Sequence, residues 1–122
     1  MMTTAVECRA LDRGYGSLEV LRGLNMEVAT GSIYGLLGPS GCGKTTLLKV
    51  LLGRLVPWGG SALALGSTPG EHGAPVPGPA VGYAPQELAL YEDLSIGETL
   101  RFHGQLQLMD RTQVAQRQAW LL

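Results

Sequence analysis

Cysteine, aromatic residues and clusters of basic charge are all scarce in this sequence of 122 residues. The two cysteines, Cys8 and Cys42, match no metal-binding spacing, so we expect reduced thiols in a cytosolic setting. The net charge of −1 and the lack of a Lys/Arg cluster argue against nucleic acid as the main partner, because phosphate backbones are bound by basic side chains. No apolar run of about 18 residues occurs, so we expect no membrane-spanning helix. The segment 1–9 lacks the apolar core of a signal peptide, and the length allows one small domain.

Glycine, by contrast, is abundant, with 18 residues, and several of them lie in one motif. The segment 38–46 reads GPSGCGKTT and fits Gly-x4-Gly-Lys-[Ser/Thr], the loop that wraps the phosphates of a nucleotide. Its backbone N–H groups form a nest for an anion at the start of a helix. Lys44 supplies a cation for the β- and γ-phosphates, and the hydroxyl of Thr45 is placed to bind Mg²⁺. The residues predicted to bind the phosphates are Gly38, Ser40, Gly41, Cys42, Gly43, Lys44, Thr45 and Thr46.

The flanking sequence supplies the setting that this motif requires. Residues 32–37 are mostly apolar and predict a short strand that runs into the loop. Residues 45–52 predict a helix that is apolar on nearly every face and therefore buried, with Gly53 as its end. A glycine-rich turn in an unrelated α/β domain is the alternative reading of the motif.

The remaining segments show local patterns of strands, loops and helices. Alternation of apolar and polar residues in 6–9 and 24–28 predicts half-buried strands. The apolar stretch 62–65 is a short candidate strand, and 67–79, which is rich in glycine and proline, predicts an irregular surface loop. Residues 80–84 predict another strand. The spacing of Ser95 and Glu98 is that of a capping box, so we expect a helix over 95–108, and a further helix from Asp110 or Thr112.

In this order, the features resemble the N-terminal half of an ATP-binding cassette (ABC) nucleotide-binding domain. The resemblance rests on Tyr15, on 20–24 and 31–38 before and into the phosphate loop, and on 81–86 and 90–100 after it. The residue sequences of the loop (38–48) and of the later segment 85–91 are most similar to those of ABC-H and ABC-G-type transporters. The similarity covers the chain from about Ala5 to Trp120 apart from the Gly/Pro-rich loop.

This resemblance implies an α/β fold, the P-loop NTPase core of ABC ATPases with an N-terminal antiparallel β subdomain. Residues 1–122 would form a partial nucleotide-binding domain, truncated before the signature motif and the Walker B strand. Its parts would be a strand-rich lead-in over 5–37, the phosphate loop and helix over 38–56, a Gly/Pro-rich insertion over 57–79, and the glutamine-loop strand with the start of the helical subdomain over 80–122.

The resemblance also assigns roles to single residues, with ATP and Mg²⁺ as the cofactors. Tyr15 resembles the aromatic residue that stacks on adenine, and a core or turn tyrosine is the alternative. Gln86 resembles the glutamine that reaches Mg²⁺, so the metal-binding candidates are Thr45 and Gln86; a surface amide is the alternative for Gln86. Four apolar residues resemble the surface that receives a membrane domain, or else helical core: Leu88, Leu90, Tyr91 and Leu94. Alkylation of Cys42, with protection by ATP, is a further hypothesis.

No residue matches the catalytic base or the switch histidine of the family. The segments 94–98 and 88–93 mimic a signature motif and a Walker B strand at the wrong spacing after Gln86, and His72 and His103 stand at neither expected position. The resemblance therefore implies a chain that binds ATP without hydrolysing it alone. It would belong to a transporter motor at the cytosolic face of a membrane, with a second nucleotide-binding domain and a transmembrane domain as partners.

Other functions remain as alternatives. A soluble ABC ATPase of translation or DNA repair would carry the same motifs, and so would a short, non-catalytic nucleotide-binding protein. A small P-loop kinase would place the loop nearer the N-terminus, and a GTPase would need Asp-x-x-Gly and Asn-Lys-x-Asp motifs that do not occur here.

Overall fold

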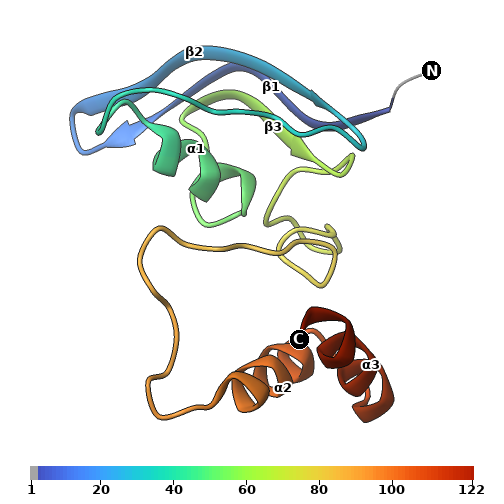
Figure 1. Ribbon diagram of the computed structural model, residues 1–122. Helices are drawn as coiled ribbons and strands as arrows, with labels where there is room; N and C mark the ends of the chain where they lie inside the picture. Colours follow the sequence, from blue (N-terminus) through green and yellow to red (C-terminus); the bar gives the residue numbers. More distant parts are fainter. Residues whose placement is uncertain (1–2) are drawn as a thin grey trace. The chain divides into compact units, whose positions relative to one another are not determined.

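The computed structural model describes residues 3–122 and divides into two compact units (Figure 1). The first unit extends to Val81 and contains β1 (Thr4–Tyr15), β2 (Leu18–Ala29), α1 (Lys44–Leu51) and β3 (Gly59–Ala64). The second unit, Gly82–Leu122, contains α2 (Ile96–Leu106) and α3 (Arg111–Leu121). The boundary between the two units falls inside the segment predicted as the glutamine-loop strand.

The first unit is built on a three-stranded antiparallel sheet in the order β2-β1-β3. The tight connection between Tyr15 and Leu18 joins β1 to β2, and Cys8 pairs with Met26 on β2 and with Ala62 on β3. The alternation in the sequence correctly predicted these half-buried strands, although both extend beyond the predicted segments. The short candidate strand at 62–65 is confirmed as the end of β3.

The core of the first unit lies between this sheet and α1, which packs on one face of it (Figure 1). The cluster consists of Cys8, Leu11, Leu21, Leu47, Val50 and Ala62. Leu48, on another face of α1, is 40% exposed, so the prediction of a helix buried on nearly every face is wrong. Burial also raises the pKa of the Cys8 thiol, with a further rise from the negative charge of Glu7.

Two segments predicted as strands are not strands in the structure. Residues 32–37 and 80–84 have no strand assignment, and no described strand forms a hydrogen-bond ladder with either segment. Ile33 is 103% exposed and Leu37 is 93% exposed. An apolar segment becomes a strand only where a neighbouring strand accepts and donates its backbone hydrogen bonds, and its own sequence does not supply that neighbour.

The Gly/Pro-rich segment after β3 is less exposed than predicted. Val76 is only 1% exposed, and its carbonyl accepts a hydrogen bond of 2.8 Å from the backbone N–H of Gly70. The segment is irregular, as predicted, but it is not purely a surface loop, because its turns fold an apolar side chain inward.

The second unit is a pair of helices that pack closely at one point. Asp110 and Gln113 cap the start of α3 reciprocally, which confirms Asp110 as its N-cap. A Cβ atom on Gly104 of α2 would lie 2.6 Å from Cγ2 of Val114 on α3, so only glycine permits this approach of the two helices. Before α2, the ring of Tyr91 meets the ring of Phe102 edge to face, with centroids 5.6 Å apart.

The predicted capping box at the start of α2 is also confirmed. The hydroxyl of Ser95 donates to Oε2 of Glu98 at 2.6 Å, and the backbone N–H of Ser95 donates to the same oxygen at 2.9 Å. In return, the backbone N–H of Glu98 donates to Oγ of Ser95 at 3.3 Å. The hydrogen bonds from the Ser95 side chain and then its backbone hold the pKa of Glu98 below its ordinary value.

This cap makes the start of α2 sensitive to acid. Because the folded-state pKa of Glu98 is lowered, its contribution to stability is present above the unfolded-state pKa and is lost as the pH falls through the folded-state pKa. We expect Ser95→Ala to raise the pKa of Glu98 toward its ordinary value, measured by NMR titration of the Glu98 carboxyl carbon. Gln113→Ala, which alters the cap of α3, is the control and should leave that titration unchanged. An identical midpoint in Ser95→Ala and the unaltered protein would contradict this explanation.

Candidate functional site

The predicted phosphate loop leads directly into α1 and leaves the start of that helix without a side-chain cap. Its N-cap is Gly43, with φ 107° and ψ 6°, and no side chain accepts a hydrogen bond from the first turn. The carbonyl of Gly43 accepts the first intrahelical bond, from the N–H of Leu47 at 2.9 Å. Uncapped N–H donors at the positive end of a helix favour an anion.

Lys44 lies at the centre of the loop and folds back over it. Its Nζ donates to the carbonyl of Gly38 at 2.5 Å and to the carbonyl of Pro39 at 2.8 Å. The same ammonium lies 3.6 Å from Sγ of Cys42. Lys44 therefore holds its charge against the loop backbone, where a bound phosphate would meet it.

The residues predicted to bind phosphate differ in exposure. Those that are exposed are Gly38, Ser40, Gly41, Cys42 and Thr45, whereas Lys44 is half-buried and Gly43 and Thr46 are buried. The exposed hydroxyl of Thr45 follows Lys44 directly and fits a ligand to Mg²⁺. The buried hydroxyl of Thr46 is instead engaged inside the protein.

Tyr15 lies close to the phosphate loop in this fold, although Gly43 comes 28 positions after Tyr15 in the sequence. The hydroxyl of Tyr15 accepts a hydrogen bond of 3.4 Å from Oγ1 of Thr46. The Tyr15 side chain is 44% exposed, so it is neither a core residue nor a free one. The contact places an accessible aromatic ring beside the first turn of α1.

The packing of the hairpin against the loop explains this placement. A Cβ atom on Gly43 would lie 2.9 Å from Cγ1 of Val20 and 2.9 Å from Cδ2 of Leu21, both on β2. β2 therefore packs directly on the backbone at the start of α1. Tyr15, at the end of β1 in the same hairpin, is carried to the loop by this contact.

Of the two predicted metal ligands, Thr45 has the chemistry to bind a magnesium ion that is held mainly by a nucleotide. Within residues 3–122, no group of three or more His, Cys, Asp or Glu side chains could hold a metal ion. Mg²⁺ commonly keeps its waters and binds few protein atoms together with substrate phosphates, so a single hydroxyl such as that of Thr45 is a suitable donor. Gln86 is exposed and belongs to the second unit, and its pairing with Thr45 remains a prediction.

Two residues beside the candidate site escaped the sequence analysis. Arg13 lies next to Tyr15, with its guanidinium carbon 5.9 Å from the centroid of the Tyr15 ring, and Trp58 lies on Arg13, with its ring centroid 5.4 Å from the same carbon. For Arg13, the sequence offers one signal: an arginine two residues before an aromatic residue on the same strand, where both side chains share one face of the sheet. Trp58 could not be found in this way, because the pairing of β3 with β1 brings it there.

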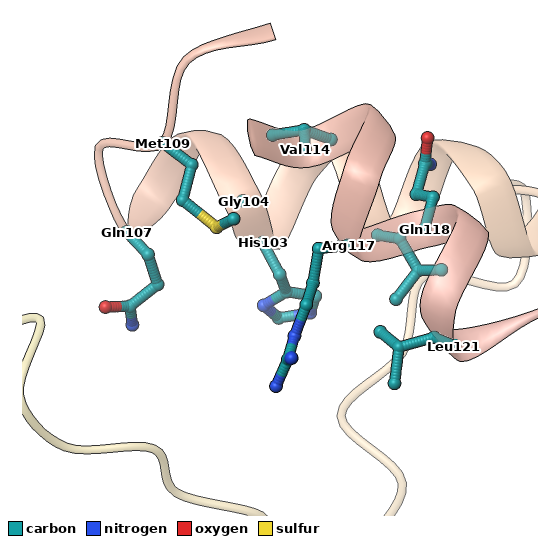
Figure 2. A pocket seen from close by; sticks show the side chains of 9 residues that line it. His103, Gly104, Gln107, Met109, Val114, Arg117, Gln118 and Leu121 are labelled. Atoms are coloured by element: carbon teal, nitrogen blue, oxygen red, sulfur yellow. The ribbon is translucent and has the colours of Figure 1, made fainter. Parts of the chain in front are cut away.

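The second unit has a pocket of its own between α2 and α3, with a volume of about 190 Å³ (Figure 2). His103 on α2 and Arg117 and Leu121 on α3 point toward the same side of the helix pair in Figure 2. The polar residues of its lining are His103, Arg117 and two glutamines, and the remaining lining residues are apolar or glycine. The pocket brings together no carboxylate or nucleophile and contains none of the predicted site residues.

Comparison with known families agrees with the motif and the geometry of the loop. The family described as ABC transporter matches residues 21–121, which is most of the chain. This chain belongs to the ABC transporter family. It is 45% identical over 98 residues to ABC transporter G family member 20 of Dictyostelium discoideum, covering 80% of this chain and 13% of that protein. It is 38% identical over 121 residues to Nod factor export ATP-binding protein I of Cupriavidus metallidurans, covering 99% of this chain and 40% of that protein.

The fold of this ABC family member agrees with a solved structure of the same class. A structure described as the ATP-binding subunit of an ABC transporter matches 89% of this chain and 45% of its own with a TM-score of 0.70 and 27% identity. The α/β P-loop fold of ABC ATPases, with an N-terminal antiparallel sheet, is thereby confirmed, as is the resemblance to G-type transporters. The chain spans less than half the length of each of these proteins. Among the helices of residues 3–122, none combines the length and the apolarity needed to cross a bilayer.

Proposed function

We propose that this chain binds Mg-ATP through the loop 38–46 and serves as the ATP-binding part of a transporter motor. The observation that carries the proposal is the position of Lys44, whose Nζ lies 2.5 Å and 2.8 Å from two loop carbonyls in front of an uncapped helix start. An ammonium so placed can exchange carbonyl oxygens for the oxygens of the β- and γ-phosphates. Thr45 offers its hydroxyl to Mg²⁺ one residue later.

The wider role follows from the family. We infer that a second nucleotide-binding domain and a transmembrane domain complete the assembly at the cytosolic face of a membrane. Nucleotide binding in this chain would then be coupled to substrate movement by groups that those partners supply. The names of the relatives, which describe ABC transporters and an export ATP-binding protein, support this assignment.

We propose that this chain alone does not hydrolyse ATP. The attacking water needs a base, and no residue here matches the catalytic glutamate of the family, while Lys44 and Mg²⁺ offset only the charge that develops on the γ-phosphate. We therefore expect no release of phosphate above the background rate. We also expect ATP to bind more strongly in the presence of Mg²⁺, because Thr45 offers a ligand to the ion.

Protection of Cys42 from alkylation tests where the nucleotide binds. Cys42 is exposed in the loop beside Lys44, whereas Cys8 is 2% exposed and its thiol has a raised pKa. We expect maleimide to modify Cys42 rapidly and Cys8 slowly, and we expect saturating Mg-ATP to slow only the reaction of Cys42. Peptide mapping by mass spectrometry measures both rates in one sample, with Cys8 as the internal control.

Two results would oppose the proposal. An unchanged rate at Cys42 in saturating Mg-ATP would place the nucleotide elsewhere. Equal slowing at Cys42 and Cys8 would indicate general stabilisation of the fold and not occupation of the loop.

A further inference from the structure

Arg13 connects the candidate adenine-binding Tyr15 to a second aromatic residue, Trp58. The guanidinium carbon of Arg13 lies over the Tyr15 ring at 5.9 Å and over the Trp58 ring at 5.4 Å from the centroids. Trp58 immediately precedes the neighbouring strand β3, and its backbone N–H donates to the carbonyl of Asp12 at 2.8 Å. These three residues, from two adjacent parts of the sheet, are called here the Tyr15–Arg13–Trp58 cluster.

The Arg13 side chain makes cation–π contacts with both aromatic rings. Its Nε is buried and has no hydrogen-bond partner within residues 3–122, and the ion pairs seen there use Arg9 and Arg22 instead. A buried N–H without a partner costs free energy. Attraction between this partly buried guanidinium and the two rings offsets that cost, which favours a defined position for all three side chains.

The cluster leaves one face of Tyr15 available. Arg13 lies over one face of the ring, the hydroxyl at its edge accepts from Thr46, and the side chain is still 44% exposed. A flat ligand can therefore stack on the opposite face. The hydroxyl edge of the ring lies beside the first turn of α1, within the same structural unit as the phosphate loop.

We propose that Arg13 and Trp58 are positioning residues for recognition of a purine base. They hold the ring of Tyr15 in the orientation in which a base can stack on its free face while the phosphates bind the loop. The inference rests on the proposed function, because it assumes a nucleotide at that loop. Arg13 and Trp58 would therefore affect the binding of the base and would leave the binding of the phosphates unchanged.

A comparison of two ligands tests this assignment in the full chain. Mg-ATP carries both base and phosphates, whereas Mg-tripolyphosphate carries phosphates alone. We expect Arg13→Met and Trp58→Leu to weaken Mg-ATP binding about three- to tenfold, measured by calorimetry, and to leave Mg-tripolyphosphate binding unchanged. Arg13→Lys and Trp58→Phe retain a cation and a ring, so they should recover most of the affinity for Mg-ATP.

The second unit provides a matched control. Arg117 stacks on Trp120 at 4.4 Å in α3, so Arg117→Met and Trp120→Leu remove the same kind of contact away from Tyr15. Neither control should change the affinity for either ligand. Circular dichroism spectra establish that each variant is folded. If one of Arg13→Met and Trp58→Leu fails to fold, the other carries the comparison.

The outcomes separate this inference from the function on which it rests. Equal loss of both ligands in the cluster variants would show a structural role and overturn the inference, and so would unchanged Mg-ATP binding. If Lys44→Ala left both affinities unchanged, the phosphate site itself would be wrong, and the inference would fall with it. Loss of both ligands in Lys44→Ala together with selective loss of Mg-ATP in the cluster variants supports both.

Discussion

Replacing Lys44 with alanine is expected to weaken Mg-ATP binding by about a hundredfold or more. The ammonium is the only positive charge in the loop 38–46, and it already lies 2.5 Å and 2.8 Å from the carbonyls of Gly38 and Pro39. In the bound state it would make charge-assisted hydrogen bonds to phosphate oxygens, each worth about 1.5–3 kcal/mol. Two such bonds correspond to a loss of at least about 3 kcal/mol, which the methyl group of alanine cannot replace.

The chain contains a matched control for this experiment. Lys49 is the only other lysine, and it lies exposed in the last turn of the same helix α1. Lys49→Ala removes the same charge from the same element without touching the loop, so we expect its affinity for Mg-ATP to stay within about twofold of the unaltered protein. Calorimetric titration of both variants makes the comparison. Equal affinities in Lys44→Ala and Lys49→Ala would show that the loop does not bind phosphate.

Replacing Gly43 with alanine is expected to destabilise the first unit by about 2–4 kcal/mol and to abolish nucleotide binding. Two effects act together at this position. Its φ of 107° is one that residues with a Cβ rarely adopt, and the added Cβ would lie 2.9 Å from atoms of both Val20 and Leu21. To relieve the clash, β2 must move away from the start of α1, and that movement displaces both Lys44 and Tyr15.

A series of glycine substitutions separates strain from clash. Gly35→Ala meets no atom within 4 Å and has no positive φ, so we expect almost no loss of stability. Gly41→Ala adds strain alone, because its φ is 81° and its Cβ would also meet no atom within 4 Å. Urea unfolding followed by tryptophan fluorescence should therefore rank the variants as Gly35→Ala, Gly41→Ala and Gly43→Ala in order of increasing loss.

A second substitution tests the proposed clash directly. Val20→Ala removes the Cγ1 atom that would meet the new Cβ, so it should restore part of the stability lost in Gly43→Ala. Strict additivity of Val20→Ala and Gly43→Ala would contradict a clash with Val20 and leave the contact with Leu21 and backbone strain as the causes.

Features that depend on neighbours in sequence were predicted well. The capping box at Ser95 and the helix start at Asp110 are confirmed because each cap closes within a single turn and needs no distant partner. The helix after the phosphate loop is confirmed for the same reason, as it begins at Lys44 within the motif itself. The alternating pattern of β1 and β2 was sufficient because a tight connection brings the two strands together.

Predictions that depended on distant partners succeeded less often. The strands predicted at 32–37 and 80–84 are wrong because no described strand pairs with them. The prediction that α1 is buried all round is also wrong, since a sheet covers only one face of it. Apolar composition indicates that a segment is suited to burial, but it does not supply the surface that buries it.

The amino-acid sequence by itself determined the glycine-rich motif at 38–46, the helix after it and the family to which the chain belongs, since these depend on residue types at fixed local spacing. Only the tertiary structure decided that Tyr15 meets Thr46 and that Gly43 packs beneath β2. It also brought Trp58 to Arg13, across two strands that are far apart along the chain. The physical reason is that a local motif is set by the chain within one turn or one hairpin, whereas contacts between distant segments arise only when a shared core selects one register and one packing face.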